Sequence, residues 1–256
     1  MLWIALALLA SLVWAIVAVL DKYLVAHELR DSILATVSSG LGTFLIFCLA
    51  ALFKGSIAAT TENAALSIAA GASYTIAIGI YYWVMQREEV SRFMALLGTM
   101  PLFVLLFGFF FLGERFTASA YIGIALIVLG AIIISLKKTK SHSWLNPVIF
   151  FALLASFFFA LRTILVKVAT DSVSIWPIMF WIGVGGGAVA LVFLAIHHPH
   201  IRKKAKLGIK HVFLVGSFNA VGFFIFTQAI ALGPASVVAA ITTGAEPIFT
   251  FLLALL

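Results

Sequence analysis

Two ionisable side chains stand inside runs of sequence that are otherwise apolar: Arg162, in the run 147–169, and Glu246, in the run 237–256. A charged side chain at the centre of a bilayer costs about 2.5–3.5 kcal/mol on insertion scales, so it needs a partner or a water-filled cavity. Two interpretations stay open. The side chains could form a static buried ion pair, or Arg162 could face an anionic group while Glu246 exchanges a proton or pairs with a substrate amine.

Other polar and aromatic side chains inside the apolar runs could bind a polar ligand, or could simply hold helices together. This group consists of Trp14, Tyr74, Asn219, Gln228, Thr242 and Thr243. Lys22 and Lys167 close their runs, and we expect them either to reach the lipid headgroups or to line the mouth of a cavity. Pro101 and Pro247 each remove a backbone donor within a run, so we expect them to bend their helices as a gating element would.

The composition indicates that these residues are positioned by helices in a bilayer. Of 256 residues, 64% are hydrophobic and 10% charged, and the mean hydropathy is +1.22; an ordinary soluble domain is about 45–50% apolar and 25% charged. A helix needs about 20 mostly apolar residues to cross the hydrocarbon core. Nine runs fit: 2–20, 33–53, 64–84, 93–112, 117–136, 147–169, 174–196, 212–232 and 237–256. They are continuously apolar rather than alternating, which predicts an all-α polytopic membrane protein.

The formal charge of +7 is carried mostly by the loops between these runs. The loops after the first, third, fifth and seventh runs hold twelve of the 16 lysines and arginines, whereas the other loops hold Lys54 and Arg115. By the positive-inside rule the first set of loops faces the cytoplasm and the N-terminus lies outside. Because this rule accounts for the positive charge, we expect no nucleic-acid partner.

The chain contains an internal repeat. The pentapeptide Ala7–Ser11 (ALLAS) recurs letter for letter as Ala152–Ser156 at an offset of 145, and Gly98–Pro101 (GTMP) aligns with Gly244–Pro247 (GAEP) at an offset of 146. A period that contains five spans inserts its second copy in the opposite orientation, because five is odd. This predicts an inverted-topology repeat with a site near the midplane where the halves meet. The predicted halves are residues 1–136 and 147–256.

At the same offsets Lys22 falls on Lys167, Arg162 on Val17 and Glu246 on Met100. We therefore expect the second half to carry most of the chemistry. The first copy continues past its proline to a Gly-Glu turn and a fifth run, while the second ends before the equivalent turn. Nine helices are expected to be present and a tenth to be missing.

These motifs resemble the drug/metabolite transporter superfamily, in particular its EamA-type ten-helix transporters. The resemblance covers all 256 residues. In the first half it rests on Leu97–Pro101 (LGTMP) followed by Leu112–Glu114 (LGE), and in the second on Ala231–Ser236 (ALGPAS) followed by Gly244–Pro247. It implies a secondary transporter, often an exporter of amino acids or related metabolites, with a cavity lined by helices one to four and six to nine. It also implies that both termini are cytoplasmic, whereas the loop charges place the N-terminus outside.

We therefore expect a secondary transporter of the plasma (inner) membrane, an exporter of a small polar metabolite such as an amino acid, working by alternating access between two inverted halves. Its partners would be the small-molecule substrate and the lipid bilayer, with proton coupling and a homodimer left open. The alternative is an inactive or accessory membrane subunit. No GxxxxGK[ST], HExxH or GxSxG motif is present in the sequence, so we expect no enzyme, cofactor or metal site.

Overall fold

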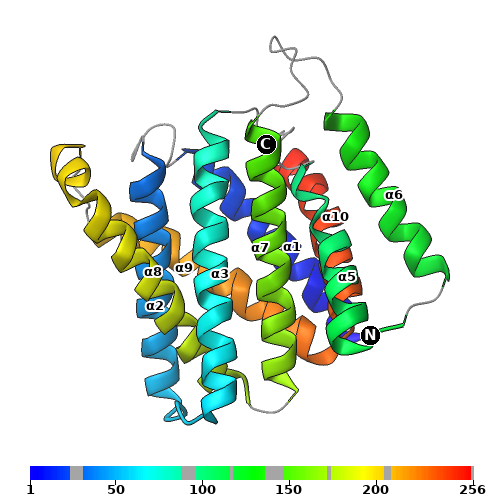
Figure 1. Cartoon of the computed structure of the whole chain (residues 1–256), viewed down its shortest axis with the longest axis horizontal. Helices are drawn as coiled ribbons and strands as arrows, with labels where there is room; N and C mark the ends of the chain where they lie inside the picture. The colour runs from blue at the N-terminus through cyan, green and yellow to red at the C-terminus, as the bar shows by residue number, and fades with distance from the viewer. Residues whose placement is uncertain are drawn as a thin grey trace.

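The computed structural model describes residues 1–23, 31–87, 96–115, 118–135, 147–171, 174–204 and 209–254. These residues form nine α-helices and no strand, which confirms the predicted all-α class (Figure 1). The helices are α1 (Leu2–Tyr23), α2 (Ser32–Phe53), α3 (Thr61–Met85), α5 (Met100–Leu112), α6 (Ala118–Ser135), α7 (Pro147–Thr170), α8 (Ile175–Lys204), α9 (Ile209–Leu232) and α10 (Ala235–Ala254).

Six of the described helices are long and apolar enough to cross a membrane: α1, α2, α3 and α7, together with Ile175–His197 of α8 and Ala235–Leu253 of α10. Helix α5 and the stretch Gly216–Leu232 of α9 are shorter apolar helices. Large apolar side chains cover much of the exterior; Phe110 and Phe111, for example, are 71% and 72% exposed. A continuous apolar exterior is stable against lipid tails rather than water. The chain is therefore an integral, multi-pass membrane protein.

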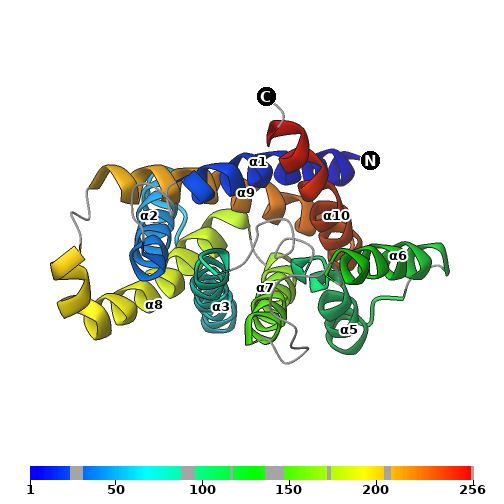
Figure 2. The same ribbon diagram turned by 90° about the horizontal axis from the view of Figure 1, so that it is seen from above.

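The helices pack in the pattern that an inverted repeat requires. Helix α1 packs against α9 and α10, and its counterpart α7 packs against α3 and α5. Likewise α2 packs against α9 as α8 does against α3, while α2 and α8 pack against each other. In Figure 1 α3 and α7 stand side by side, and Figure 2 shows α1, α9 and α10 on the opposite side of the bundle. This packing supports a pseudo-twofold axis between the halves. The exact limits of the halves stay a prediction.

Two glycines that are repeat counterparts each allow a close contact between helices of the two halves. Gly71 in α3 and Gly216 in α9 differ by the repeat offset of 145. A methyl group on Gly71 would overlap the carbonyl group of Ile182 in α8, and one on Gly216 would overlap the backbone of Gly42 in α2. Only glycine permits two helix backbones to approach so closely. A glycine therefore allows close packing both between α3 and α8 and between α9 and α2.

The predicted run 93–112 is not one straight helix. Gly98 and Thr99 form a turn, and α5 begins at Met100 with Pro101 in its first turn. The expectation that Pro101 bends the middle of a helix is therefore wrong, because a proline in the first turn removes a donor that has no partner within the helix. Thr99 Oγ1 donates to the carbonyl oxygen of Leu96 at 2.7 Å and stabilises the turn.

Pro247, in contrast, lies inside α10, as expected. Since proline has no N–H group, the carbonyl group four residues earlier, on Thr243, loses its helical donor. Thr243 Oγ1 donates to the carbonyl oxygen of Ala239 at 2.7 Å, and Thr250 Oγ1 donates to that of Glu246 at 2.8 Å. These side-chain bonds lie on either side of the proline, and α10 continues through it.

The beginning of α10 is capped from the other half of the chain. Glu114 follows α5. Its Oε1 atom accepts a hydrogen bond from the backbone N–H of Ala235, and its Oε2 atom accepts one from the hydroxyl of Ser236, each at 2.9 Å. A carboxylate satisfies otherwise unpaired N–H groups at a helix N-terminus and is favoured there by the helix dipole. Gly108 leaves room for this carboxylate, since a methyl group there would lie 2.8 Å from Oε2 of Glu114. The contact joins α5 to α10.

Candidate functional site

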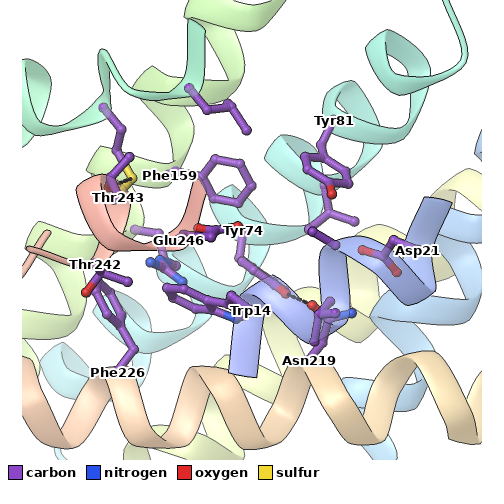
Figure 3. A pocket seen from close by; sticks show the side chains of 16 residues that line it. Trp14, Asp21, Tyr74, Tyr81, Phe159, Asn219, Phe226, Thr242, Thr243 and Glu246 are labelled. Carbon is purple, nitrogen blue, oxygen red and sulfur yellow. Dashed lines mark hydrogen bonds between the residues drawn. The ribbon is translucent and has the colours of Figure 1, made fainter. Parts of the chain in front are cut away.

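A cavity of about 90 Å³ lies between α1, α3, α7, α9, α10 and the beginning of α5 (Figure 3). A cavity needs roughly 10–15 Å³ to hold one water, so this volume suits about six waters or a small organic molecule. Most of its wall is apolar or aromatic. Polar groups come from Asp21, Tyr74, Tyr81, Arg162, Asn219, Thr242, Thr243 and Glu246. An apolar cavity with a few convergent polar groups is the usual form of a small-molecule site.

The cavity lies where the two halves meet. Six pairs of its lining residues are repeat counterparts: Trp14 and Phe159, Val17 and Arg162, Tyr74 and Asn219, and Tyr81 and Phe226 at an offset of 145, with Leu97 and Thr243, and Met100 and Glu246, at 146. One pair touches directly, because the hydroxyl of Tyr74 donates to Oδ1 of Asn219 at 2.9 Å. Counterparts gather around one cavity only when the pseudo-twofold axis passes near it. The pairing supports the repeat and its expected site at the interface.

The guanidinium group of Arg162 is held among aromatic rings and is only 2% exposed. Its Cζ atom lies 5.5 Å from the ring centre of Trp14, 5.6 Å from Tyr74, 5.9 Å from Phe159, and 4.7 Å from both Phe223 and Phe226. Each such contact contributes up to about 2 kcal/mol when the cation is desolvated. The ring faces stabilise the charge but accept no strong hydrogen bond.

The hydrogen-bond donors of Arg162 are not all satisfied. Its Nη2 atom donates to Oγ1 of Thr163 at a long 3.4 Å, while Nε and Nη1 are buried without a hydrogen-bond partner. The static ion pair with Glu246 is therefore not formed, although both residues line the cavity. Buried donors of a charged group are costly to leave unpaired. Such donors beside a cavity are suited to bind a carboxylate or another planar anion.

Glu246 and two threonines line the cavity from α10 (Figure 3). Glu246 is half-buried. Thr242 and Thr243 also line the cavity, and their hydroxyls donate to the carbonyl oxygens of Val238 and Ala239 at 2.8 and 2.7 Å. Each hydroxyl keeps lone pairs that can accept a bond from a ligand. The expected cavity residues on this helix are thus brought together on one face.

Three of the residues named from the sequence lie elsewhere. Gln228 is half-buried and does not line the cavity. Lys22 is exposed, and Nζ of Lys167 in α7 forms an ion pair at 3.1 Å with Oδ1 of Asp171, which directly follows that helix. Neither lysine lines this cavity. Pro101 and Pro247 also lie outside its wall, so a role for them would be mechanical.

Sequence reasoning missed Asp21. The first run was predicted to end at residue 20, but α1 continues to Tyr23 and buries Asp21 to 3% exposure while its neighbour Lys22 stays exposed. The carboxyl group lines the cavity, and its Oδ1 accepts the hydroxyl of Tyr82 at 2.9 Å. A signal was present: residues 14, 17, 18 and 21 all line the cavity and follow the spacing of one helix face.

The comparison with known proteins agrees with this architecture. The model of the EamA-like transporter family matches residues 1–136 and 146–256, so nearly the whole chain is covered. No curated protein matches the chain. The two matched segments contain the two sets of helices that surround the cavity.

Proposed function

The chain belongs to the EamA-like transporter family, and on that premise we propose that it is a secondary transporter that exports a small polar metabolite, such as an amino acid, across the plasma (inner) membrane. Members of the family are membrane transporters. The observation that carries the proposal for this substrate is Arg162, whose Nε and Nη1 donors are buried beside the cavity without partners. A substrate carboxylate would complete their hydrogen bonds.

The arrangement of the halves suggests how such a substrate would move. Because the cavity is built from repeat counterparts, rocking one half against the other would expose it alternately to the two sides of the membrane. Helix α10 contributes Glu246 to the cavity and contains Pro247 directly after it. In the proposal this proline and the turn before Pro101 are the gating points. Glu246 would couple transport to a proton by gaining and losing one as its exposure changes.

Counterflow in proteoliposomes tests this function. Vesicles that contain the purified protein are loaded with a mixture of unlabelled amino acids and diluted into each labelled amino acid in turn, at zero and at inward proton gradient. We expect labelled substrate to accumulate transiently above the level in protein-free vesicles, and the gradient to change the rate. If no labelled amino acid accumulates under either condition, the accessory-subunit alternative is favoured.

A further inference from the structure

We propose that Asp21 is the binding site for the ammonium group of a zwitterionic substrate whose carboxylate is bound by Arg162. The inference rests on the proposed transport function and deepens it, because it names the charge pattern that the cavity selects. It assigns Asp21 to substrate specificity, a role separate from the proton exchange that is assigned to Glu246.

Asp21 is the most firmly held carboxyl group of the cavity. It is 3% exposed, and the hydroxyl of Tyr82, which is itself fully buried, fixes its Oδ1 atom at 2.9 Å. One neutral donor does not use the capacity of a carboxylate, which has about four lone-pair sites. The remaining sites suit a cation in the cavity that the residue lines. A buried carboxylate needs such a partner, since charge without compensation is costly at this depth.

The cation of the cavity wall does not fill that role. Two of the three Arg162 nitrogens have no partner and the third donates to Thr163, so Arg162 does not pair with Asp21. Tyr74, Arg162 and Asp21 all line the cavity. Figure 3 shows Asp21 at one side of the cavity, across Tyr74 and Asn219 from Thr242 and Thr243. Because Arg162 and Asp21 both line the cavity and do not pair with each other, the wall offers separate sites for a negative and a positive group.

The charges of the wall discriminate between substrate classes. Arg162 attracts a carboxylate, but a simple anion would also meet the carboxyl groups of Asp21 and Glu246, which line the same cavity. A simple cation would meet Arg162. A zwitterion is the small solute that places an attractive group at both sites, so the unpaired groups act against the other two classes. The hydroxyl of Tyr82 donates a hydrogen bond to Asp21 without adding positive charge.

Binding of matched probes to the full chain in lipid nanodiscs tests the assignment by isothermal titration calorimetry. L-valine, isovalerate and isobutylamine share one hydrocarbon skeleton and carry both charges, only the carboxylate, or only the ammonium. A fourth probe, 5-aminopentanoate, carries both charges at a greater separation. We expect at least one of the two zwitterions to bind the wild-type protein about 10- to 100-fold more tightly than either single-charge probe.

The decisive variant is Asp21→Asn, which removes the charge but keeps an oxygen that can accept the Tyr82 hydroxyl. It is expected to bind isovalerate and the preferred zwitterion within about threefold of one another, whereas the neighbouring Lys22→Gln variant keeps the wild-type preference. The assignment is overturned if neither zwitterion binds wild-type protein more tightly than isovalerate. This test uses only wild-type protein, so it does not depend on whether a variant folds. It is also overturned if Asp21→Asn keeps the preference. Counterflow with a broad amino-acid mixture would still report transport in either case, so failure of this assignment differs from failure of the proposed function.

Discussion

At matched positions of the cavity, the first half of the chain contributes Val17 and Met100 where the second contributes Arg162 and Glu246. The backbone positions correspond through the repeat, but the side chains differ in charge. The first half is not purely a wall, since Asp21 reaches the same cavity and its counterpart in the second half is apolar. The comparison indicates that the repeat determines where side chains meet, while differences between counterparts determine what the cavity binds.

The largest loss of transport is expected from Arg162→Met, which keeps a long side chain and removes the hydrogen-bond donors that distinguish the second half from the first. We expect counterflow to fall about 100-fold, because a hydrogen bond to a charged group contributes about 1.5–3 kcal/mol and the substrate carboxylate would lose more than one. The matched control is its counterpart, Val17→Ala, for which we expect a change of less than about threefold. Equal losses in the two variants would show that the halves do not differ in chemistry.

Although the two halves contribute different chemical groups to the cavity, the stability of their packing should depend equally on the two counterpart glycines. Gly71→Ala and Gly216→Ala each place a methyl group against a helix backbone of the opposite half. Overpacking of this kind costs typically about 1–3 kcal/mol, so both variants should melt at lower temperature in detergent by similar amounts. Gly130→Ala in α6 is the control, because a methyl group there meets nothing within 4 Å. Loss of stability at only one of the two glycines would contradict a symmetric interface.

Much of the architecture could be predicted because it depends on long signals. An apolar run of about 20 residues specifies a span without reference to its neighbours. The offset of 145 between Ala7–Ser11 and Ala152–Ser156 predicts which helices are counterparts from the sequence alone. Arg162 and Glu246 could be selected since each stands alone in an apolar run. Their shared cavity follows from the repeat.

Other features depend on short distances between helices that the sequence does not encode locally. Asp21 was missed because an acidic residue beside Lys22 at the end of a run is typical of the headgroup region. Its burial follows from tertiary packing, in which its carboxyl group accepts the hydroxyl of Tyr82 from α3. Pro101 was predicted to lie in mid-helix because the sequence of a continuous apolar run does not show whether a proline interrupts one helix or begins a new one. The turn before it also depends on α7, where the hydroxyl of Ser156 lies 3.3 Å from that of Thr99.

Glu246→Gln tests whether proton coupling depends on the second half, which carries Glu246 where the first half carries Met100. The substitution keeps the shape of the side chain and removes its ability to exchange a proton. We expect uptake driven by a proton gradient to fall about tenfold, while counterflow without a gradient changes less, because exchange needs no net movement of protons. The counterpart variant Met100→Leu should respond to the gradient as wild type does. A gradient response that survives in Glu246→Gln would assign coupling to another group.

The smallest effect is expected at the contact between the halves that lies outside the cavity. Glu114→Ala removes the acceptor for the N–H of Ala235 and the hydroxyl of Ser236. Loss of an N-terminal cap costs about 0.5–2 kcal/mol, so we expect thermal unfolding in detergent to shift by an amount that corresponds to roughly 1 kcal/mol. Arg115→Ala, at an exposed neighbouring position, is the control and should leave unfolding unchanged.

The same variant also shows how α10 takes part in transport. Helix α10 carries Glu246, Thr242 and Thr243 into the cavity, and its first turn is tied to the end of α5 by Glu114. If the cap only stabilises the fold, Glu114→Ala lowers the unfolding temperature and leaves the apparent KM of counterflow unchanged. If it also orients α10, the apparent KM rises while Arg115→Ala stays normal. We expect the second result, because a helix held at one end by a contact from the other half keeps its cavity face in register only while that contact exists.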